Sequence, residues 1–293
     1  MIELRVKDFS LEQTLECGQC FHFKKLSDGA YVTVHKDKAV RCAQEDDVLK
    51  LFNAETDEDA AFWSDYFDLD NDYAGIKSRL CSCDDKMPEI ICDCGGIHLL
   101  RQEFFETLIS FIISQNKQIP HIKQIVAAIS KAHGKHLGTF DGEDFYSFPD
   151  ANTLSKVSED ELRALKTGFR APYIKDAVEK AASGIITEEK LLAMTYDEKM
   201  ETLKTIKGIG DKVANCVILY SLGDREAFQL DVWIKRITEH VYFDGKDTDK
   251  KVIMQFAADR YGQLGGYAQQ YMFYFGRNLK KLSESQKQRK TEK

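Results

Sequence analysis

The chain has 293 residues, of which 43% are hydrophobic and 30% are charged, and its formal net charge is −7. This composition is enough for a substantial core shared among two or three subdomains. No apolar run approaches the roughly 18 residues that cross a bilayer, and the opening M-I-E-L-R-V-K does not have the form of a signal peptide. We therefore expect no membrane partner and a cytoplasmic location.

The acidic charge is concentrated in the first third of the chain. Residues 1–100 carry 11 Lys and Arg against 21 Asp and Glu, whereas the remainder carries 30 against 27. A nucleic-acid binder with this balance would turn its acidic part away from the ligand. It would depend on a local patch and on backbone amides rather than on net charge.

Residues 1–97 are predicted to form an antiparallel β domain that packs with the C-terminal helix. Short runs rich in β-branched and aromatic residues alternate with turn residues, as in a meander. The runs are Phe21–Phe23, Tyr31–His35 and Ala39–Cys42. The acidic stretch 45–60 predicts a short surface helix.

From about residue 98 onward the pattern is nearly all helical. In residues 104–113 apolar side chains surround the predicted helix almost completely, so we expect it at the centre of the fold. Two capping boxes mark further helix starts, Ser158…Glu161 and Thr195…Glu198. Later helices are predicted at about 211–222, 232–243, 248–262 and 267–282, followed by a basic tail.

The predicted fold class is therefore α+β. An N-terminal antiparallel β-sheet domain is followed by two mostly α-helical subdomains, 98–230 and 231–293. The first of these contains a helix-hairpin-helix element at 203–216, and the second completes a cleft.

The stretch Leu203–Cys216 reads L-K-T-I-K-G-I-G-D-K-V-A-N-C and predicts two helices joined by a tight hairpin. Gly208 and Gly210 would let the backbone take left-handed angles and approach another molecule closely. The N–H groups that begin the second helix would then point outward, a geometry that grips a phosphate. A DNA backbone is the expected ligand, and an ordinary connection between two helices is the alternative.

An aspartate at the next helix start extends this pattern. Asp231 lies 19 residues after Lys212 and directly precedes an apolar helix, at a natural N-cap. A hairpin, a lysine just past it and this aspartate together resemble the helix-hairpin-helix-GPD superfamily of DNA base-excision glycosylases. The resemblance covers roughly residues 15–280 and is closest to the 8-oxoguanine DNA glycosylase/lyases.

The resemblance assigns catalytic roles to Lys212 and Asp231. Breaking the bond between a base and C1′ of its sugar passes through an oxocarbenium-like transition state, which a nearby carboxylate stabilises. A neutral amine can attack C1′ and form a Schiff base, after which β-elimination cuts the strand. Lys212 would be that amine, in a first helical turn whose dipole disfavours the ammonium form. A surface lysine and a structural N-cap are the alternative.

The resemblance also predicts a pocket for the flipped base. Gly18 in G-Q-C-F matches a glycine whose carbonyl accepts the N7–H that only oxidised guanine carries; the lone pair of guanine at N7 would be repelled. Cys216, one helical turn after Lys212, would pack on one face of the base. Gln269 would bond the base edge, and Phe273 would stack on the other face. A β-turn glycine and an aromatic core helix are the alternatives.

Three further residues match positions that act on the duplex in this family. Asn116 would enter the space left by the flipped base, Phe169 would wedge into the stack, and Arg170 would read the opposite cytosine. The second opposite-base arginine of the family aligns with His121, so we expect relaxed discrimination for cytosine. Trp233 replaces a family histidine, so phosphate handling must differ. A helix C-cap and a solvent-exposed guanidinium are the alternatives for Asn116 and Arg170.

The cysteines predict no metal centre. Cys81-Ser82-Cys83 and Cys92-Asp93-Cys94 supply four thiolates, which suffice for zinc, but C-x-C is tighter than the usual spacing and the family uses no metal there. No cysteine follows Cys216, so the four-cysteine iron–sulfur cluster of related enzymes is absent. The resemblance implies no required cofactor and leaves room for a monovalent cation at the hairpin carbonyls.

Three functions remain in view. The first is a monomeric 8-oxoguanine DNA glycosylase/AP lyase acting on double-stranded DNA that contains oxidised guanine, associated with the nucleoid in a prokaryote. The second is a glycosylase for another damaged base, which Lys212 argues against because alkyl-purine relatives usually hydrolyse with the aspartate alone. The third is a non-catalytic DNA-binding module, in which Asp231 and Cys216 would be idle.

Overall fold

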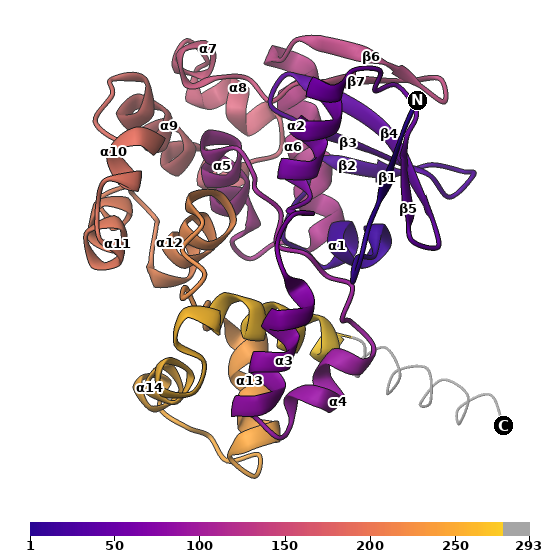
Figure 1. The fold of residues 1–293 in the computed structure, drawn as a ribbon. Helices are drawn as coiled ribbons and strands as arrows, with labels where there is room; N and C mark the ends of the chain where they lie inside the picture. Colours follow the sequence, from indigo (N-terminus) through magenta and orange to yellow (C-terminus); the bar gives the residue numbers. More distant parts are fainter. Residues whose placement is uncertain (278–293) are drawn as a thin grey trace, which may run out of the picture.

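The computed structural model of the chain describes residues 1–277 (Figure 1). An antiparallel sheet lies on one side of the molecule, a group of helices lies beside it, and a second group of helices lies below both. The helix formed by residues 265–277, yellow in Figure 1, runs between the upper and lower parts. The end of the predicted last helix and the basic tail lie outside the described residues.

The sheet has five strands in the order β1-β5-β4-β3-β2, all antiparallel. The strands are β1 (Ile2–Arg5), β2 (Phe23–Lys25), β3 (Tyr31–His35), β4 (Lys38–Glu45) and β5 (Val48–Leu51). The predicted meander corresponds to β2, β3 and β4. Strand β5 lies inside the acidic stretch for which a helix was expected. It forms a strand because the buried Leu49 and Leu51 alternate with more exposed neighbours.

Two short helices complete this domain. They are α1 (Leu11–Glu16) and α2 (Asp57–Tyr66), and α2 begins at a capping box of Thr56 and Asp59. Trp63 and Phe67 are buried against apolar side chains of the sheet in one core cluster. Residues 1–75 are therefore more helical than the turn pattern predicted.

The next two helices leave the sheet and join the lower helices. These are α3 (Tyr73–Cys83) and α4 (Met87–Cys92). Between them Asp84 is buried and accepts hydrogen bonds from the hydroxyls of Tyr242 and Tyr261, with Arg260 Nη1 3.3 Å from its carboxylate. A buried carboxylate needs such partners to offset its desolvation, so this contact ties residues 73–92 to the C-terminal helices.

The central helix is α5 (Phe104–Ser114), as its apolar pattern predicted. It is followed by α6 (Ile119–His133) and then by a β-hairpin of β6 (His136–Phe140) and β7 (Glu143–Tyr146), which the helical prediction missed. Phe140 and Phe145 of this hairpin pack on the sheet. The hairpin therefore connects the upper helical group to the β domain.

The remaining upper helices lead to the predicted helix-hairpin-helix. They are α7 (Ala151–Ser155), α8 (Glu159–Ala164), α9 (Ala171–Ala182), α10 (Glu188–Leu192), α11 (Tyr196–Lys204) and α12 (Asp211–Val217). Both predicted capping boxes are present, at the starts of α8 and α11. A π-helical turn, Ile218–Leu222, continues α12, and the lower group then adds α13 (Val232–Tyr242) and α14 (Lys250–Tyr261).

Candidate active site

The hairpin between α11 and α12 is anchored by Ile206 and Ile209, which are buried. Gly208 has φ +78°, and a Cβ built on it would lie 2.4 Å from the ring of Tyr173, so only glycine fits there. Gly210 departs from the expectation, because its φ of −109° is ordinary extended backbone and open space surrounds its Cα. It is the N-cap of α12 and is exposed.

Lys212 lies in the first turn of α12, and its side chain is half-buried. Its Nζ is 5.4 Å from the centre of the Phe111 ring, which belongs to the central helix α5. One turn later Cys216 is completely buried. Burial raises the pKa of the Cys216 thiol to about 11, while the neighbouring Lys212 ammonium lowers it and the Asp231 carboxylate raises it. Lys212, Cys216 and Asp231 therefore form one electrostatic group.

Asp231 is the N-cap of α13, as predicted. Its Oδ1 accepts hydrogen bonds from the backbone N–H groups of Trp233, at 2.9 Å, and Ile234, at 2.8 Å. Neither of these bonds uses Oδ2. The helix start therefore holds the carboxylate through one of its two oxygens.

The structure brings Gly18 and Phe273 together, although 255 residues separate them in the chain. Gly18 has φ +91°, and a Cβ there would lie 3.3 Å from Phe273 Cε1 and 3.2 Å from Ile119 Cδ1. Gln269, one turn before Phe273, is 2% exposed, and its Oε1 has no hydrogen-bond partner in the described structure. A buried acceptor without a partner carries a desolvation cost of about 1–3 kcal/mol, which a ligand donor could remove.

Gln229 is a site residue that the sequence analysis missed. It is buried, and its Oε1 accepts a hydrogen bond from the Cys216 thiol at 2.9 Å. Its Nε2 has no partner among the described atoms. The available signal was a single amide within the apolar run A-F-Q-L that leads into Asp231.

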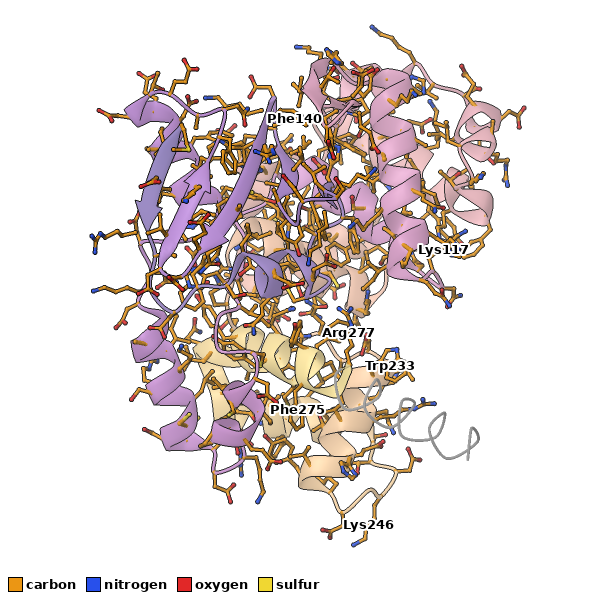
Figure 2. The ribbon with its side chains drawn as sticks, turned by 90° about the vertical axis from the view of Figure 1, so that its right-hand side faces the viewer. Lys117, Phe140, Trp233, Lys246, Phe275 and Arg277 are labelled. Atoms are coloured by element: carbon orange, nitrogen blue, oxygen red, sulfur yellow. The ribbon has the colours of Figure 1, made fainter. Side chains whose placement is uncertain are left out.

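Three of the residues expected at the duplex, Asn116, His121 and Phe169, lie on the outside of the upper helical group. Asn116 follows the C-terminus of α5 with φ +51° and is exposed, as is His121 on α6. Phe169 is 50% exposed, which is unusual for a phenylalanine side chain and suits a wedge. Figure 2 shows that Lys117 of this group and Trp233 of α13, which is 39% exposed, lie toward the same side of the molecule.

Arg170 is not a solvent-exposed guanidinium, the alternative that its position in the sequence allowed. It is 3% exposed, its Nη2 donates to the Gln115 carbonyl, and its Nη1 donates to the Thr167 carbonyl at 3.3 Å. Burial lowers the pKa of its guanidinium, and the group also lies over the Phe169 ring, 4.2 Å from its centre. In this conformation the Arg170 side chain supports the Phe169 ring and links it to the backbone at Gln115 and Thr167, while its Nε has no hydrogen-bond partner in the described structure.

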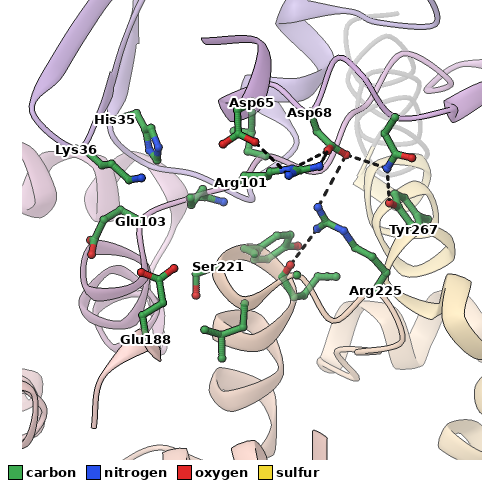
Figure 3. Close-up of a pocket in the computed structure, with 17 residues that line it drawn as sticks. His35, Lys36, Asp65, Asp68, Arg101, Glu103, Glu188, Ser221, Arg225 and Tyr267 are labelled. Carbon is green, nitrogen blue, oxygen red and sulfur yellow. Dashed lines mark hydrogen bonds and ion pairs between the residues drawn. The ribbon is translucent and has the colours of Figure 1, made fainter. Parts of the chain in front are cut away.

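A separate cavity of about 450 Å³ opens where the β domain meets the helices (Figure 3). Several of its charged side chains form hydrogen bonds and ion pairs with one another. Asp68 is buried, accepts from Arg101 Nε at 2.8 Å and from Asn71 Nδ2 at 3.1 Å, and has Arg225 Nη2 at 3.9 Å. None of the predicted catalytic or base-pocket residues lines this cavity.

Within residues 1–277, no three His, Cys, Asp or Glu side chains are gathered in a way that could hold a metal ion. Cys94 is buried and its thiol donates to the Ile90 carbonyl, whereas Cys83 and Cys92 are exposed. In the described structure the thiols of the two C-x-C pairs are not gathered into one cluster. No helix in this part of the chain has the length and apolarity of a membrane span.

The family models divide the chain into two consecutive parts. Residues 1–108 match the 8-oxoguanine DNA glycosylase N-terminal domain. Residues 109–261 match the HhH-GPD superfamily base excision DNA repair protein model. The boundary falls within α5, the central helix.

Individual proteins show the same similarity. A probable N-glycosylase/DNA lyase of Methanothermobacter thermautotrophicus is 32% identical over 62% of this chain, a match that spans 64% of its own length. The structure of MBOgg1 in complex with a low affinity DNA ligand is 41% identical, with a TM-score of 0.90 over 94% of this chain and 95% of that one. The Clostridium acetobutylicum 8-oxoguanine glycosylase/lyase, in complex with dsDNA containing cytosine opposite 8-oxoG, is 35% identical, with a TM-score of 0.88 over 94% and 93% of the two chains.

Proposed function

The chain belongs to the HhH-GPD superfamily of base-excision DNA repair proteins, and on this premise we propose that it removes 8-oxoguanine from duplex DNA and then cuts the strand as an AP lyase. The observation that carries the proposal is that Lys212 and Asp231, on successive helices α12 and α13, both lie near enough to the buried Cys216 to shift its pKa, within a fold that matches such enzymes over nearly its whole length. Double-stranded DNA is the partner.

The Lys212 amine would carry out the covalent step. The lone pair of the amine forms a bond to C1′ as the bond from C1′ to the base breaks. The base departs with the electron pair of the broken bond. Asp231 stabilises the positive charge that develops on the sugar, with its direction fixed by the two capping hydrogen bonds. The adduct loses an amine proton, and its C1′–O4′ bond opens with O4′ taking a proton, which leaves a Schiff base between Lys212 and C1′. The Schiff base acidifies the C2′ proton, and loss of that proton breaks the C3′–O3′ bond, so that the 3′ phosphate leaves and the strand is cut.

The pocket would distinguish 8-oxoguanine from guanine by the N7–H group, a hydrogen-bond donor that guanine lacks. The Gly18 carbonyl accepts N7–H of 8-oxoguanine and repels the N7 lone pair of guanine. The buried acceptor of Gln269 supplies a partner for the N–H groups on the base edge, and Phe273 and Cys216 cover the two faces. A bound base with these N–H groups would give the Gln269 Oε1 the hydrogen-bond partner that it lacks in the described structure.

On the opposite strand we propose relaxed selection for cytosine. Asn116 fills the gap, Phe169 wedges into the stack, and Arg170 must leave the Gln115 carbonyl before it can reach a base. His121 gives no fixed bidentate donor pair in place of an arginine.

Gly208 and Gly210 would place the hairpin on the phosphates. The hairpin carbonyls could take a monovalent cation, and we propose a cytoplasmic monomer that needs no cofactor.

Borohydride trapping on duplexes with 8-oxoguanine opposite each of the four bases tests the proposal. The wild-type chain should give a covalent adduct with all four, differing by less than about tenfold, which corresponds to one discriminating contact. Lys212→Gln should abolish the adduct, whereas Lys246→Gln, on a lysine whose side chain is 78% exposed and lies at the far tip in Figure 2, should leave it intact. Excision without any adduct would favour a glycosylase that hydrolyses with the aspartate alone. Neither excision nor adduct would favour a DNA-binding module.

A further inference from the structure

The C-terminal end of α1, which leads directly into Gly18, is held by two side chains of the helix 265–277. Gln270 Nε2 donates to the Cys17 carbonyl at 3.3 Å, and Arg277 Nη1 donates to the Glu16 carbonyl at 2.9 Å. Gln270 and Arg277 lie seven positions apart, two helical turns, and therefore share a face. Phe273, between them on that face, contacts Gly18 itself. One helix thus fixes the two carbonyls before the glycine and covers the glycine as well.

Tyr220 fixes the orientation of the Gln270 amide. The Cys17 carbonyl can only accept, so the amide nitrogen of Gln270 must face it. The amide oxygen then faces the Tyr220 hydroxyl, which donates to it at 2.5 Å. Tyr220 and Gln270 are both buried, so water cannot replace either bond if its partner is removed.

A second set of bonds holds the backbone after Gly18. The Gln19 side chain donates to the His98 carbonyl at 2.7 Å and accepts from the Leu100 N–H at 2.9 Å. Gln102 Nε2 donates to the Gln19 carbonyl at 2.8 Å. The Cys17 carbonyl before Gly18 and the Gln19 carbonyl and side chain after it are therefore bonded to distant parts of the chain. Gly18 itself, at φ +91°, has the backbone freedom of glycine, so the fixed neighbours on either side restrain the direction of its carbonyl.

We propose that Gln270, oriented by Tyr220, is a positioning residue that sets the direction of the Gly18 carbonyl and thereby the selection of oxidised guanine over guanine. The inference rests on the proposed function, since it concerns the pocket of the same site. A carbonyl that could turn would escape repulsion by the N7 lone pair of guanine and would lose the bond to N7–H. Restraint on both sides prevents this turn and keeps the difference between the two bases.

The test separates base recognition from the chemistry at C1′. Gln270→Met keeps the size of the side chain and removes its donor and acceptor, Tyr220→Phe removes one hydroxyl, and Gln255→Met makes the same exchange at an exposed glutamine of α14. Each full-length variant is measured in single turnover on an 8-oxoguanine duplex and on a duplex with a preformed abasic site. The affinity ratio for 8-oxoguanine and guanine duplexes is measured in a Lys212→Gln background.

Gln270→Met should lower the excision rate and the affinity ratio about tenfold, the effect of one lost buried hydrogen bond, and should leave cleavage at the abasic site within about twofold. Tyr220→Phe should shift both in the same direction by less, and Gln255→Met should resemble the wild type. Equal losses on both substrates would identify a purely structural role and overturn the inference, as would an unchanged affinity ratio. A wild-type chain that does not excise 8-oxoguanine would overturn the proposed function itself.

Discussion

At the scale of single residues, Cys216 is a buried thiol that lies near Lys212 and donates to Gln229. Burial keeps its pKa near 11, so at neutral pH it is a thiol that donates to Gln229 rather than a thiolate that would pair with Lys212. The thiol therefore serves as an apolar surface beside the amine. A sequence motif predicts Lys212, Asp231 and Cys216, but it does not predict Gln229 or the burial of Arg170, because both depend on contacts made by residues distant in the chain.

The variant Asp231→Asn tests the negative charge of Asp231 separately from its role as the N-cap of α13. Asparagine caps helices as well as aspartate does, so the unfolding free energy should change by less than about 0.5 kcal/mol. The excision rate should fall about 100-fold or more, because the developing positive charge on the sugar loses its carboxylate. Single-turnover excision and urea unfolding measure the two effects. A variant that unfolds more easily but excises at the wild-type rate would reduce Asp231 to a structural cap.

His98 gives a prediction about pH. It is buried against Tyr73, with ring centres 3.6 Å apart, and burial lowers its pKa to about 4 from about 6.5. Between these values the unfolded chain binds a proton that the folded chain does not, so stability is full above pH 6.5 and is lost as pH falls toward 4.

Urea unfolding at pH 7 and pH 5 measures this contribution. The wild type should lose about 1–2 kcal/mol more than His98→Asn, whose side chain does not titrate, over that interval. His240→Asn, at an exposed position on α13, should follow the wild type. Equal losses in His98→Asn and the wild type would show that other groups cause the acid sensitivity.

At the scale of elements, local signals predicted helices better than strands. The apolar residues of α5 and the capping boxes of α8 and α11 are set by neighbours in sequence. The β6–β7 hairpin also had a local signal that was passed over, the pair Asp141-Gly142, whose φ angles of +52° and +77° suit a two-residue hairpin turn. Strand β1 is short and pairs only with the distant β5, so its own residues do not define it, whereas β5 follows β4 directly and its alternating Leu49 and Leu51 were a local signal.

The two hairpin glycines form a matched pair. Gly208→Ala must place a methyl group within the Tyr173 ring and keep a positive φ, so it should destabilise the fold by about 1–3 kcal/mol and weaken DNA binding. Gly210→Ala, in extended backbone with open space around it, should be tolerated in the unbound protein. Urea unfolding of the two variants decides the matter. Equal stability would mean that the close approach of Gly208 to Tyr173 does not restrict that position.

At the scale of the whole molecule, the site is assembled from three regions of the chain. In the proposed site, the β domain supplies Gly18, the upper helices supply Lys212 and Cys216, α13 of the lower helices supplies Asp231, and the helix 265–277 supplies Phe273. Figure 1 shows the helix 265–277 running between the upper and lower parts, where it contacts the Gly18 loop through Phe273 and Gln270. The family resemblance predicts that these residues share one site, whereas composition does not, because the net charge of −7 argues against a DNA ligand.

The most direct test of the account is to locate the covalent adduct. The wild-type chain is reduced with borohydride on an 8-oxoguanine duplex, digested, and mapped by mass spectrometry. The account predicts a single modified peptide with the sugar remnant on Lys212. A remnant on another lysine or on the terminal amine, with Lys212 unmodified, would contradict it.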